Sequence, residues 1–144
     1  GQNMSKSEQE AWKEIESIFN EFNDADKYVF SVPMWNFGVP YTLKHYIDVI
    51  TQPGLAWTFS PDDGFKGLVE GKALAIYATG GSYAAGSESE AFDLQKPSFE
   101  GWLGFIGLTD VSRLVMAPTL ATPEDLASQE TALTRDAERL AETF

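Results

Sequence analysis

Two short apolar segments constrain the fold of this chain more than any other feature. Residues 28–32 read Tyr-Val-Phe-Ser-Val and residues 73–78 read Ala-Leu-Ala-Ile-Tyr-Ala, and neither run alternates polar with apolar side chains. A continuously apolar strand is typical of a parallel sheet that helices cover on both faces. We therefore predict an α/β protein with strands at residues 27–32 and 72–78.

Helical patterns flank these strands. In the first of them apolar side chains recur every three or four residues, and Ser7 with Glu10 would open it as a capping box. Pro40 suits the first position of the second helix, because its missing N–H would be unpaired there. Thr122 is expected to cap the last helix. A third strand is expected at residues 111–116, and helices at about 7–22, 40–52, 92–106 and 123–142. This order, α-β-α-β-α-β-α, predicts one domain with a parallel sheet.

Composition excludes several classes of function. The 144 residues carry 22 acidic and 10 basic side chains, a net charge of −12, which disfavours binding to nucleic acid or to anionic membranes. There is no cysteine, and the single histidine, His45, is expected at the surface or in helix packing. No apolar run approaches the ~20 residues of a membrane span. We expect a cytoplasmic protein with no nucleic-acid or membrane partner.

Two loops that follow strands form the candidate site. Met34–Phe37 offers a Trp face, a Phe face and an amide, and Thr79–Ser82 contains two glycines that would let a ligand approach the backbone closely. Because both loops follow parallel strands, they should lie at the same edge of the sheet and suit a planar heterocycle with hydrogen-bonding edges. On the residues alone, two simpler interpretations stay open: aromatic residues that cap the core, and a tight turn at Gly80-Gly81.

Four blocks of sequence carry a family resemblance. They are Pro-Met-Trp-Asn-Phe at 33–37, Lys-His-Tyr-Ile-Asp at 44–48, Thr-Gly-Gly at 79–81, and Gly-Trp-Leu-Gly-Phe-Ile-Gly-Leu-Thr-Asp-Val at 101–111. Together they resemble the FMN-dependent NADH azoreductase and quinone reductase family, whose members have often been labelled acyl carrier protein phosphodiesterase. The first and last blocks are specific, whereas Gly-Gly alone is not. The resemblance covers essentially the whole chain.

The resemblance implies a flavodoxin-like three-layer αβα fold with a parallel sheet, working as a homodimer with FMN at the subunit interface. Hydride would pass from NAD(P)H through the flavin to quinones or azo compounds. No catalytic acid or base and no metal ligand is implied. Many relatives have Ser-Arg where this chain has Ala78 and Thr79, so contacts there would come from the backbone. Trp57 and Phe59 would lie near the substrate pocket. The residues implied to contact FMN are Met34, Trp35, Asn36, Phe37, Ala78, Thr79, Gly80 and Gly81.

One departure from the family is large. Family members begin with a strand, a Ser-rich phosphate-binding loop, a helix and a second strand, and this sequence starts at the helix that follows them. Residues 1–144 are therefore expected to be the carboxyl-terminal portion of a single flavodoxin-like domain, with strand 27–32 at an unpaired edge. The alternative to an enzyme is a non-catalytic flavodoxin-like electron carrier or interaction module.

Overall fold

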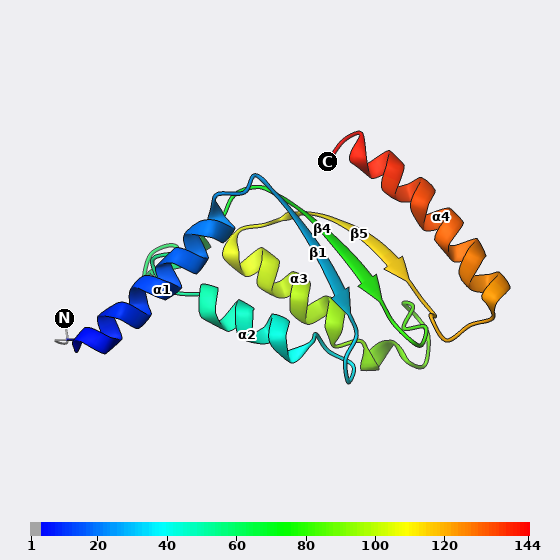
Figure 1. Ribbon diagram of the computed structural model, residues 1–144, viewed down its shortest axis with the longest axis horizontal. Helices are drawn as coiled ribbons and strands as arrows, with labels where there is room; N and C mark the ends of the chain where they lie inside the picture. Colours follow the sequence, from blue (N-terminus) through cyan, green and yellow to red (C-terminus); the bar gives the residue numbers. More distant parts are fainter. Residues whose placement is uncertain (1–3) are drawn as a thin grey trace.

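The computed structural model describes residues 4–144 and confirms the parallel sheet. Its three strands are β1 (Lys27–Pro33), β4 (Lys72–Ala78) and β5 (Asp110–Met116), in the spatial order β1-β4-β5 (Figure 1). Their last residues lie opposite one another, so the carboxyl ends of all three strands meet at one edge. The bounds expected from the apolar segments are correct to within one residue.

Helices complete a three-layer α/β arrangement. α2 (Tyr41–Ile50) and α3 (Gln95–Ile106) lie on one face of the sheet, and α4 (Pro123–Ala141) runs along β5 on the other (Figure 1). α1 (Lys6–Asn23) extends away from the amino-terminal ends of the strands. The core joins the sheet to α2 and α3, and each of its large side chains contributes about 1.5–3 kcal/mol by burial. It includes Phe22, Tyr28, Val32, Ile50, Ala75, Tyr77, Phe99, Leu103, Ile106 and Leu108.

The face of β1 opposite the core departs from the sequence expectation. Continuous apolar character predicts cover on both faces, yet Val29 is 60% exposed, because no helix among residues 4–144 lies over it. Within the same residues β1 pairs only with β4, so one of its edges is open. The expectation of an unpaired edge is thus met, and the expectation of cover on both faces is wrong for β1.

The helices α1, α2 and α4 begin at residues with the expected capping chemistry, but two of these three helix starts differ by one or two residues from the sequence prediction. The capping box of α1 is Ser5 with Glu8, not Ser7 with Glu10: the Ser5 hydroxyl accepts from the Glu8 amide at 3.3 Å, and the Glu8 carboxylate accepts from the Ser5 amide at 2.7 Å. Both pairs have the required spacing, and the earlier pair lengthens the helix. Pro40 is the residue before α2, not its first residue. Thr122 caps α4 as expected.

Two further elements differ from the expectation. Trp57–Ser60 (β2) and Gly64–Gly67 (β3) form an antiparallel hairpin, where the sequence indicated one extended piece, a turn and a loop. The third helix begins at Gln95 rather than near Phe92, because a separate 3-10 turn, η1 (Glu90–Phe92), precedes it. The sequence pattern merged these two elements into one.

Candidate functional site

The two candidate loops are joined by hydrogen bonds at the carboxyl edge of the sheet. The Met34 amide donates to the Ala78 carbonyl at 2.9 Å, which extends the β1–β4 pairing into the first loop. The Thr79 amide donates to the Met116 carbonyl at 3.1 Å, and the Thr119 amide returns to the Thr79 carbonyl at 2.8 Å. The prediction that the loops lie together is therefore confirmed, and the segment after β5 joins them.

The first loop is a tight turn with a strained backbone. The Trp35 amide donates to the Gly38 carbonyl at 2.9 Å, and the Gly38 amide donates to the Trp35 carbonyl at 3.0 Å. Asn36 and Phe37 between them have φ of 48° and 69°, the left-handed pattern of a type I′ turn. A bulky residue in this conformation costs roughly 1–2 kcal/mol.

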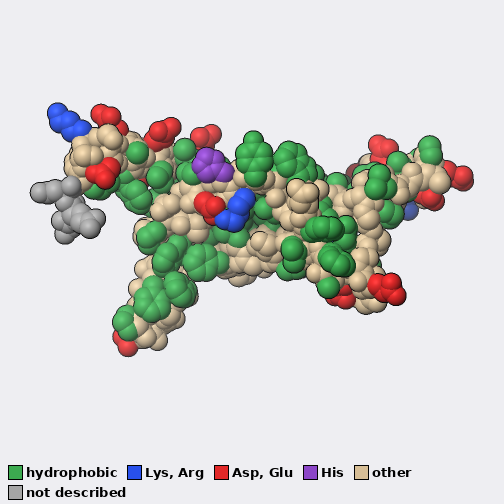
Figure 2. Space-filling view, turned by 90° about the horizontal axis from the view of Figure 1, so that it is seen from below, with side chains coloured by type: hydrophobic (Ala, Val, Ile, Leu, Met, Phe, Trp, Pro, Cys, Tyr) green, Lys and Arg blue, Asp and Glu red, His purple; other side chains and the backbone are tan. Residues whose placement is uncertain are grey.

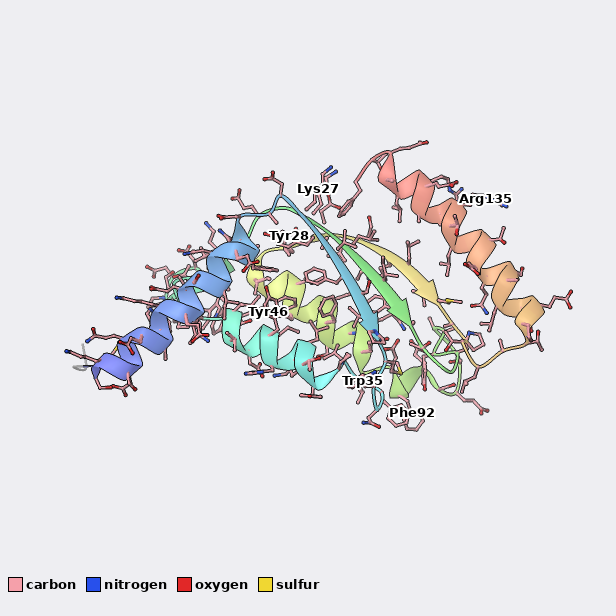
Figure 3. The ribbon with its side chains drawn as sticks, viewed as in Figure 1. Lys27, Tyr28, Trp35, Tyr46, Phe92 and Arg135 are labelled. Carbon is pink, nitrogen blue, oxygen red and sulfur yellow. The ribbon has the colours of Figure 1, made fainter. Side chains whose placement is uncertain are left out.

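This turn presents its hydrogen-bonding groups outward. Within residues 4–144 neither the Asn36 nor the Phe37 amide donates a hydrogen bond. Trp35 is 52% exposed and Phe37 is 47% exposed, which rules out the interpretation that they cap the core. Figure 3 places Trp35 at the carboxyl end of β1, beyond the packed sheet. The loop therefore combines two free N–H donors, a side-chain amide and exposed aromatic faces.

The second loop is stabilised by a hydrogen bond between two of its own residues. Thr79 is only 2% exposed, and its hydroxyl donates to the Gly81 carbonyl at 2.8 Å, so this side chain is already satisfied. A Cβ on Gly80 would lie 3.3 Å from Leu120 Cδ1, and one on Gly81 would lie 3.5 Å from the Tyr83 ring. Gly80 and Gly81 form a bend without the hydrogen bond of a tight turn, and they make room for neighbouring side chains. Backbone groups remain the available contacts here.

A surface cavity of about 540 Å³ lies beside the first loop. Trp35 and Tyr41, whose ring centroids are 6.4 Å apart, form an aromatic wall, and Lys44 adds a cation at its rim. Lys44 forms an ion pair with Asp48 at 2.5 Å, and His45 beside them is exposed (Figure 2, purple). Tyr41 was not predicted from the sequence, although its place directly after Pro40 is a signal that could have indicated it. The lining residues are Trp35, Asn36, Gly38, Val39, Tyr41, Lys44, Leu94 and Ser98.

Trp57 and Phe59 lie elsewhere in the chain. They belong to the β2–β3 hairpin, where Trp57 is 5.6 Å from Phe105 between ring centroids and Phe59 is 5.0 Å from Phe65. Phe105 is near the carboxyl end of α3, whereas the first loop is bonded to the amino end of that helix. α3 has 12 residues, and a helix of this length extends about 18 Å. One chain therefore does not bring these two aromatic residues to the loops.

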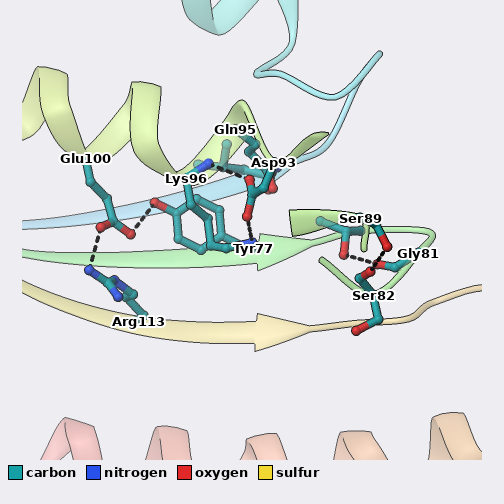
Figure 4. A network of polar contacts seen from close by, with 11 residues as sticks. Tyr77, Gly81, Ser82, Ser89, Asp93, Gln95, Lys96, Glu100 and Arg113 are labelled. Atoms are coloured by element: carbon teal, nitrogen blue, oxygen red, sulfur yellow. Dashed lines mark hydrogen bonds and ion pairs between the residues drawn. The ribbon is translucent and has the colours of Figure 1, made fainter. Parts of the chain in front are cut away.

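A polar network behind the second loop fixes α3 to the sheet (Figure 4). The Tyr77 hydroxyl donates to Glu100 at 3.1 Å, and Arg113 of β5 pairs with the same carboxylate at 2.6 Å. Lys96 pairs with Asp93 and lies 5.7 Å from the centre of the Tyr77 ring. Burial raises the pKa of Tyr77, and the Glu100 charge raises it further, so Tyr77 stays neutral. The network is structural, and the sequence pattern did not reveal it.

Residues 4–144 contain neither a membrane-spanning helix nor a metal-binding cluster. None of the helices within residues 4–144 is both long and apolar enough to cross a membrane. The same part of the chain holds no cluster of three or more His, Asp or Glu side chains that could bind a metal ion.

The parallel sheet, its three layers and the paired loops at its carboxyl edge define an α/β protein of the flavodoxin type. The profile of the family described as "Flavodoxin-like fold" matches residues 2–142. The chain belongs to this family, in the branch that contains FMN-dependent NADH:quinone oxidoreductases and azoreductases. The fold class and the resemblance expected from the sequence are confirmed.

Three similar proteins illustrate this relationship. An FMN-dependent NADH:quinone oxidoreductase of Desulfotalea psychrophila is 48% identical over 133 residues, which are 92% of this chain and 61% of that protein. FMN-dependent NADH:quinone oxidoreductase 9 of Burkholderia lata is 41% identical over 148 residues, covering 100% and 70% of the two chains. The structure of an FMN-dependent NADH-azoreductase from Bacillus anthracis in complex with FMN has a TM-score of 0.82 and 25% identity, covering 98% and 68%. The chain thus spans about 61% of the length of the first of these relatives.

Proposed function

We propose that the chain belongs to an FMN-dependent oxidoreductase that passes hydride from NAD(P)H through the flavin to quinones or azo compounds. The observation that supports this most directly is the strained turn at Trp35–Gly38, whose free amides and exposed aromatic faces lie at the same edge of the sheet as the Gly80-Gly81 backbone. The relatives and the solved neighbour that bears FMN are named for this chemistry. These named similarities do not favour the alternative of a non-catalytic electron carrier or interaction module.

The residues of the two loops suit the isoalloxazine ring of FMN. Its flat face needs aromatic or apolar contacts, which Met34, Trp35 and Phe37 offer. Its polar edge needs donors and acceptors, and Asn36 supplies both in its side-chain amide, next to two free backbone N–H groups. On the other side, Ala78, Thr79, Gly80 and Gly81 would contribute backbone groups. When bound, FMN would supply the redox chemistry.

The chain's own residues would bind FMN, orient it and the substrate, and exclude water from the site. Neither the first loop, residues 34–38, nor residues 78–81 contain a titratable side chain. The loops therefore hold no general acid or base, and a quinone or azo compound would take its protons from solvent. The cavity walled by Trp35 and Tyr41, with Lys44 at its rim, suits a planar aromatic acceptor.

A homodimer would complete this site. Hydrophobic side chains cover much of the projecting arm at the lower left of Figure 2, which is the β2–β3 hairpin. Phe59 and Phe65 of the hairpin are largely exposed, and Phe105 beside them is partly so. On the outer face of α3, Gly101 and Gly104 have open space around the position of a Cβ, so a second helix could approach closely. We place Trp57 and Phe59 of one subunit over the flavin site of the other.

The open face of the sheet supports the proposed domain organisation. Val29 is exposed and β1 has a free edge within residues 4–144, while the relatives are longer than this chain. We infer that residues 1–144 are the carboxyl-terminal portion of a single flavodoxin-like domain whose remaining strands would pair with β1 and hold the FMN phosphate. We place the enzyme in the cytoplasm, where reduced nicotinamide is produced. Reading the coding sequence upstream of Gly1 tests the domain proposal directly.

Replacing Trp35 with alanine tests the function. The intact protein is expected to bind FMN and to oxidise NADH when 1,4-benzoquinone is added. Because stacking on an aromatic side chain contributes about 1–3 kcal/mol, Trp35→Ala should raise the Kd for FMN by roughly tenfold or more. Flavin fluorescence titration measures this. Trp12→Ala, which removes the same side chain from α1, is the matched control and should leave the Kd unchanged. Wild-type protein that stays colourless with FMN would refute the proposal.

Gly101→Arg tests the dimer. Arginine has a higher helix propensity than glycine and meets no neighbour within one chain, so the subunit should fold normally. A large charged side chain at the proposed contact should, however, shift the protein from dimer to monomer in analytical ultracentrifugation. Ala127→Arg on exposed α4 is the control and should stay dimeric. A dimer that tolerates Gly101→Arg would place the interface elsewhere.

A further inference from the structure

Two consecutive residues at the start of α3 hold both flanks of the first loop. The Gln95 side chain donates from Nε2 to the Val32 carbonyl at 2.8 Å, just before the loop. The Leu94 amide donates to the Phe37 carbonyl at 3.0 Å, inside the turn. Gln95 is fully buried, so its hydrogen bond is shielded from water. The loop is therefore bracketed by a segment that lies about 60 residues away in sequence.

A ring contact adds a third link between the same two segments. Phe92, the last residue of η1, lies 5.6 Å from Phe37 between ring centroids, with the rings tilted by 39°. Figure 3 shows Phe92 and Trp35 close together at the lower edge of the view. Phe92 is 56% exposed, so its ring adds little to the core. Its principal aromatic contact is Phe37.

The segment that makes these three contacts is itself anchored. Asp93 is buried and pairs with Lys96, and its carboxylate also accepts from the Lys96 amide at 3.1 Å (Figure 4). On the other side, the Glu90 carboxylate accepts from the Gly86 amide at 2.7 Å. Because residues 90–95 are fixed by these contacts, they can restrain the Trp35–Gly38 turn.

Phe37 is the residue that needs such support. Asn tolerates the left-handed backbone conformation comparatively well, whereas a large side chain such as Phe adopts it only where surrounding contacts impose it. Without those contacts, the backbone at Phe37 would relax, and the free amides at 36 and 37 would lose the positions that the turn gives them.

We propose that residues 90–95 form a clamp that keeps the Trp35–Gly38 turn in its strained, flavin-competent conformation, with Phe92 as a positioning residue that acts through Phe37. The inference rests on the proposed function, because it assigns the turn to flavin binding. A ligand's apparent affinity falls in proportion to the fraction of protein in the competent conformation. The clamp raises that fraction before FMN arrives.

The first experiment measures how often the Trp35–Gly38 turn opens when no FMN is present. The Trp35 and Gly38 amides are hydrogen bonded only while the turn is formed, so their hydrogen exchange rates report its opening. In Phe92→Ala both rates should rise about tenfold, and Phe92→Tyr should restore them, because the exposed ring edge leaves room for a hydroxyl. Val115→Ala, a partly exposed position on β5, is the control and should leave both rates unchanged.

The second experiment measures FMN affinity in the intact protein. Phe92→Ala should raise the Kd for FMN about tenfold, which corresponds to ~1.4 kcal/mol, and Phe92→Tyr should return it to the wild-type value. Phe37→Ala and Phe37→Gly both lose the ring, but only alanine keeps the strain. Phe37→Gly should therefore bind FMN several times more tightly than Phe37→Ala.

The outcomes separate the clamp from the proposed function. Unchanged exchange rates in Phe92→Ala, or faster exchange with an unchanged Kd, would overturn the clamp. Equal Kd values for Phe37→Ala and Phe37→Gly would overturn the role of strain. If wild-type protein does not bind FMN, the proposed function fails, and the exchange rates still decide whether Phe92 holds the turn.

Discussion

Gly107→Ala is expected to lower the free energy of unfolding by about 2–5 kcal/mol. Gly107 follows the last residue of α3 with φ of 116°, and the Leu108 amide closes the helix by donating to the Leu103 carbonyl at 2.9 Å. A Cβ there would lie 2.4 Å from the Val69 carbonyl oxygen, a backbone atom that cannot rotate away. The left-handed backbone costs roughly 1–2 kcal/mol with a side chain, and the overlap adds about 1–3 kcal/mol.

A matched control separates these two costs. Gly54 also has a positive φ, of 81°, but a Cβ there meets nothing within 4 Å. Gly54→Ala should therefore show only the backbone cost, roughly 1–2 kcal/mol. Chemical denaturation of the two variants measures the difference. Equal destabilisation by both would mean that the contact between Gly107 and Val69 relaxes freely, contrary to the packing described here.

The sheet was predictable because its signal is local. The apolar runs at 28–32 and 73–78 are recognisable as strands without knowledge of their neighbours, and their bounds hold to within one residue, although β1 is covered on one face only. Helix starts were less certain, since Ser5 with Glu8 and Ser7 with Glu10 satisfy the same pattern. The hairpin was missed because its two strands have four residues each, too few to show alternation.

The candidate site was predictable only in part. Met34–Phe37 could be located because a loop after a parallel strand has a known place at the sheet edge. The left-handed backbone of Phe37 could not, since phenylalanine has no preference for it and the contacts proposed to hold it come from Phe92 and Leu94. Such contacts depend on the packing of α3. The sequence therefore indicated which residues form the loop but not what holds its shape.

Two inactive variants are expected to restore activity when they share a dimer. Trp35→Asp would place a charge where the flavin ring should lie, and Phe59→Asp would do the same in the hairpin proposed to cover it. Both side chains are about half exposed, 52% and 56%, so neither substitution should prevent folding. Each homodimer is expected to lose most of its NADH-dependent quinone reduction, because every site would contain one damaged part.

The mixed dimer differs because the damaged parts can fall in the same site. A loop from the Phe59→Asp subunit and a hairpin from the Trp35→Asp subunit would form one intact site, and the other site would carry both defects. In a two-fold symmetric dimer about half of the sites in purified heterodimer, or roughly a quarter in a random mixture, would then be active. Co-expression with two different affinity tags isolates the heterodimer for assay.

Two controls make the result decisive. Differently tagged copies of Trp35→Asp, co-purified in the same way, should regain nothing, and ultracentrifugation must show that Phe59→Asp remains dimeric. If the mixed dimer recovers no quinone reductase activity, the hairpin would have to cover the flavin site of its own subunit. That would require the hairpin to span a distance of roughly 18 Å, the length of α3. A fully active Phe59→Asp homodimer would remove the hairpin from the site altogether. Recovery is the expected result, because the fold places the loop and the hairpin at opposite ends of α3, and the proposed dimer would bring them together.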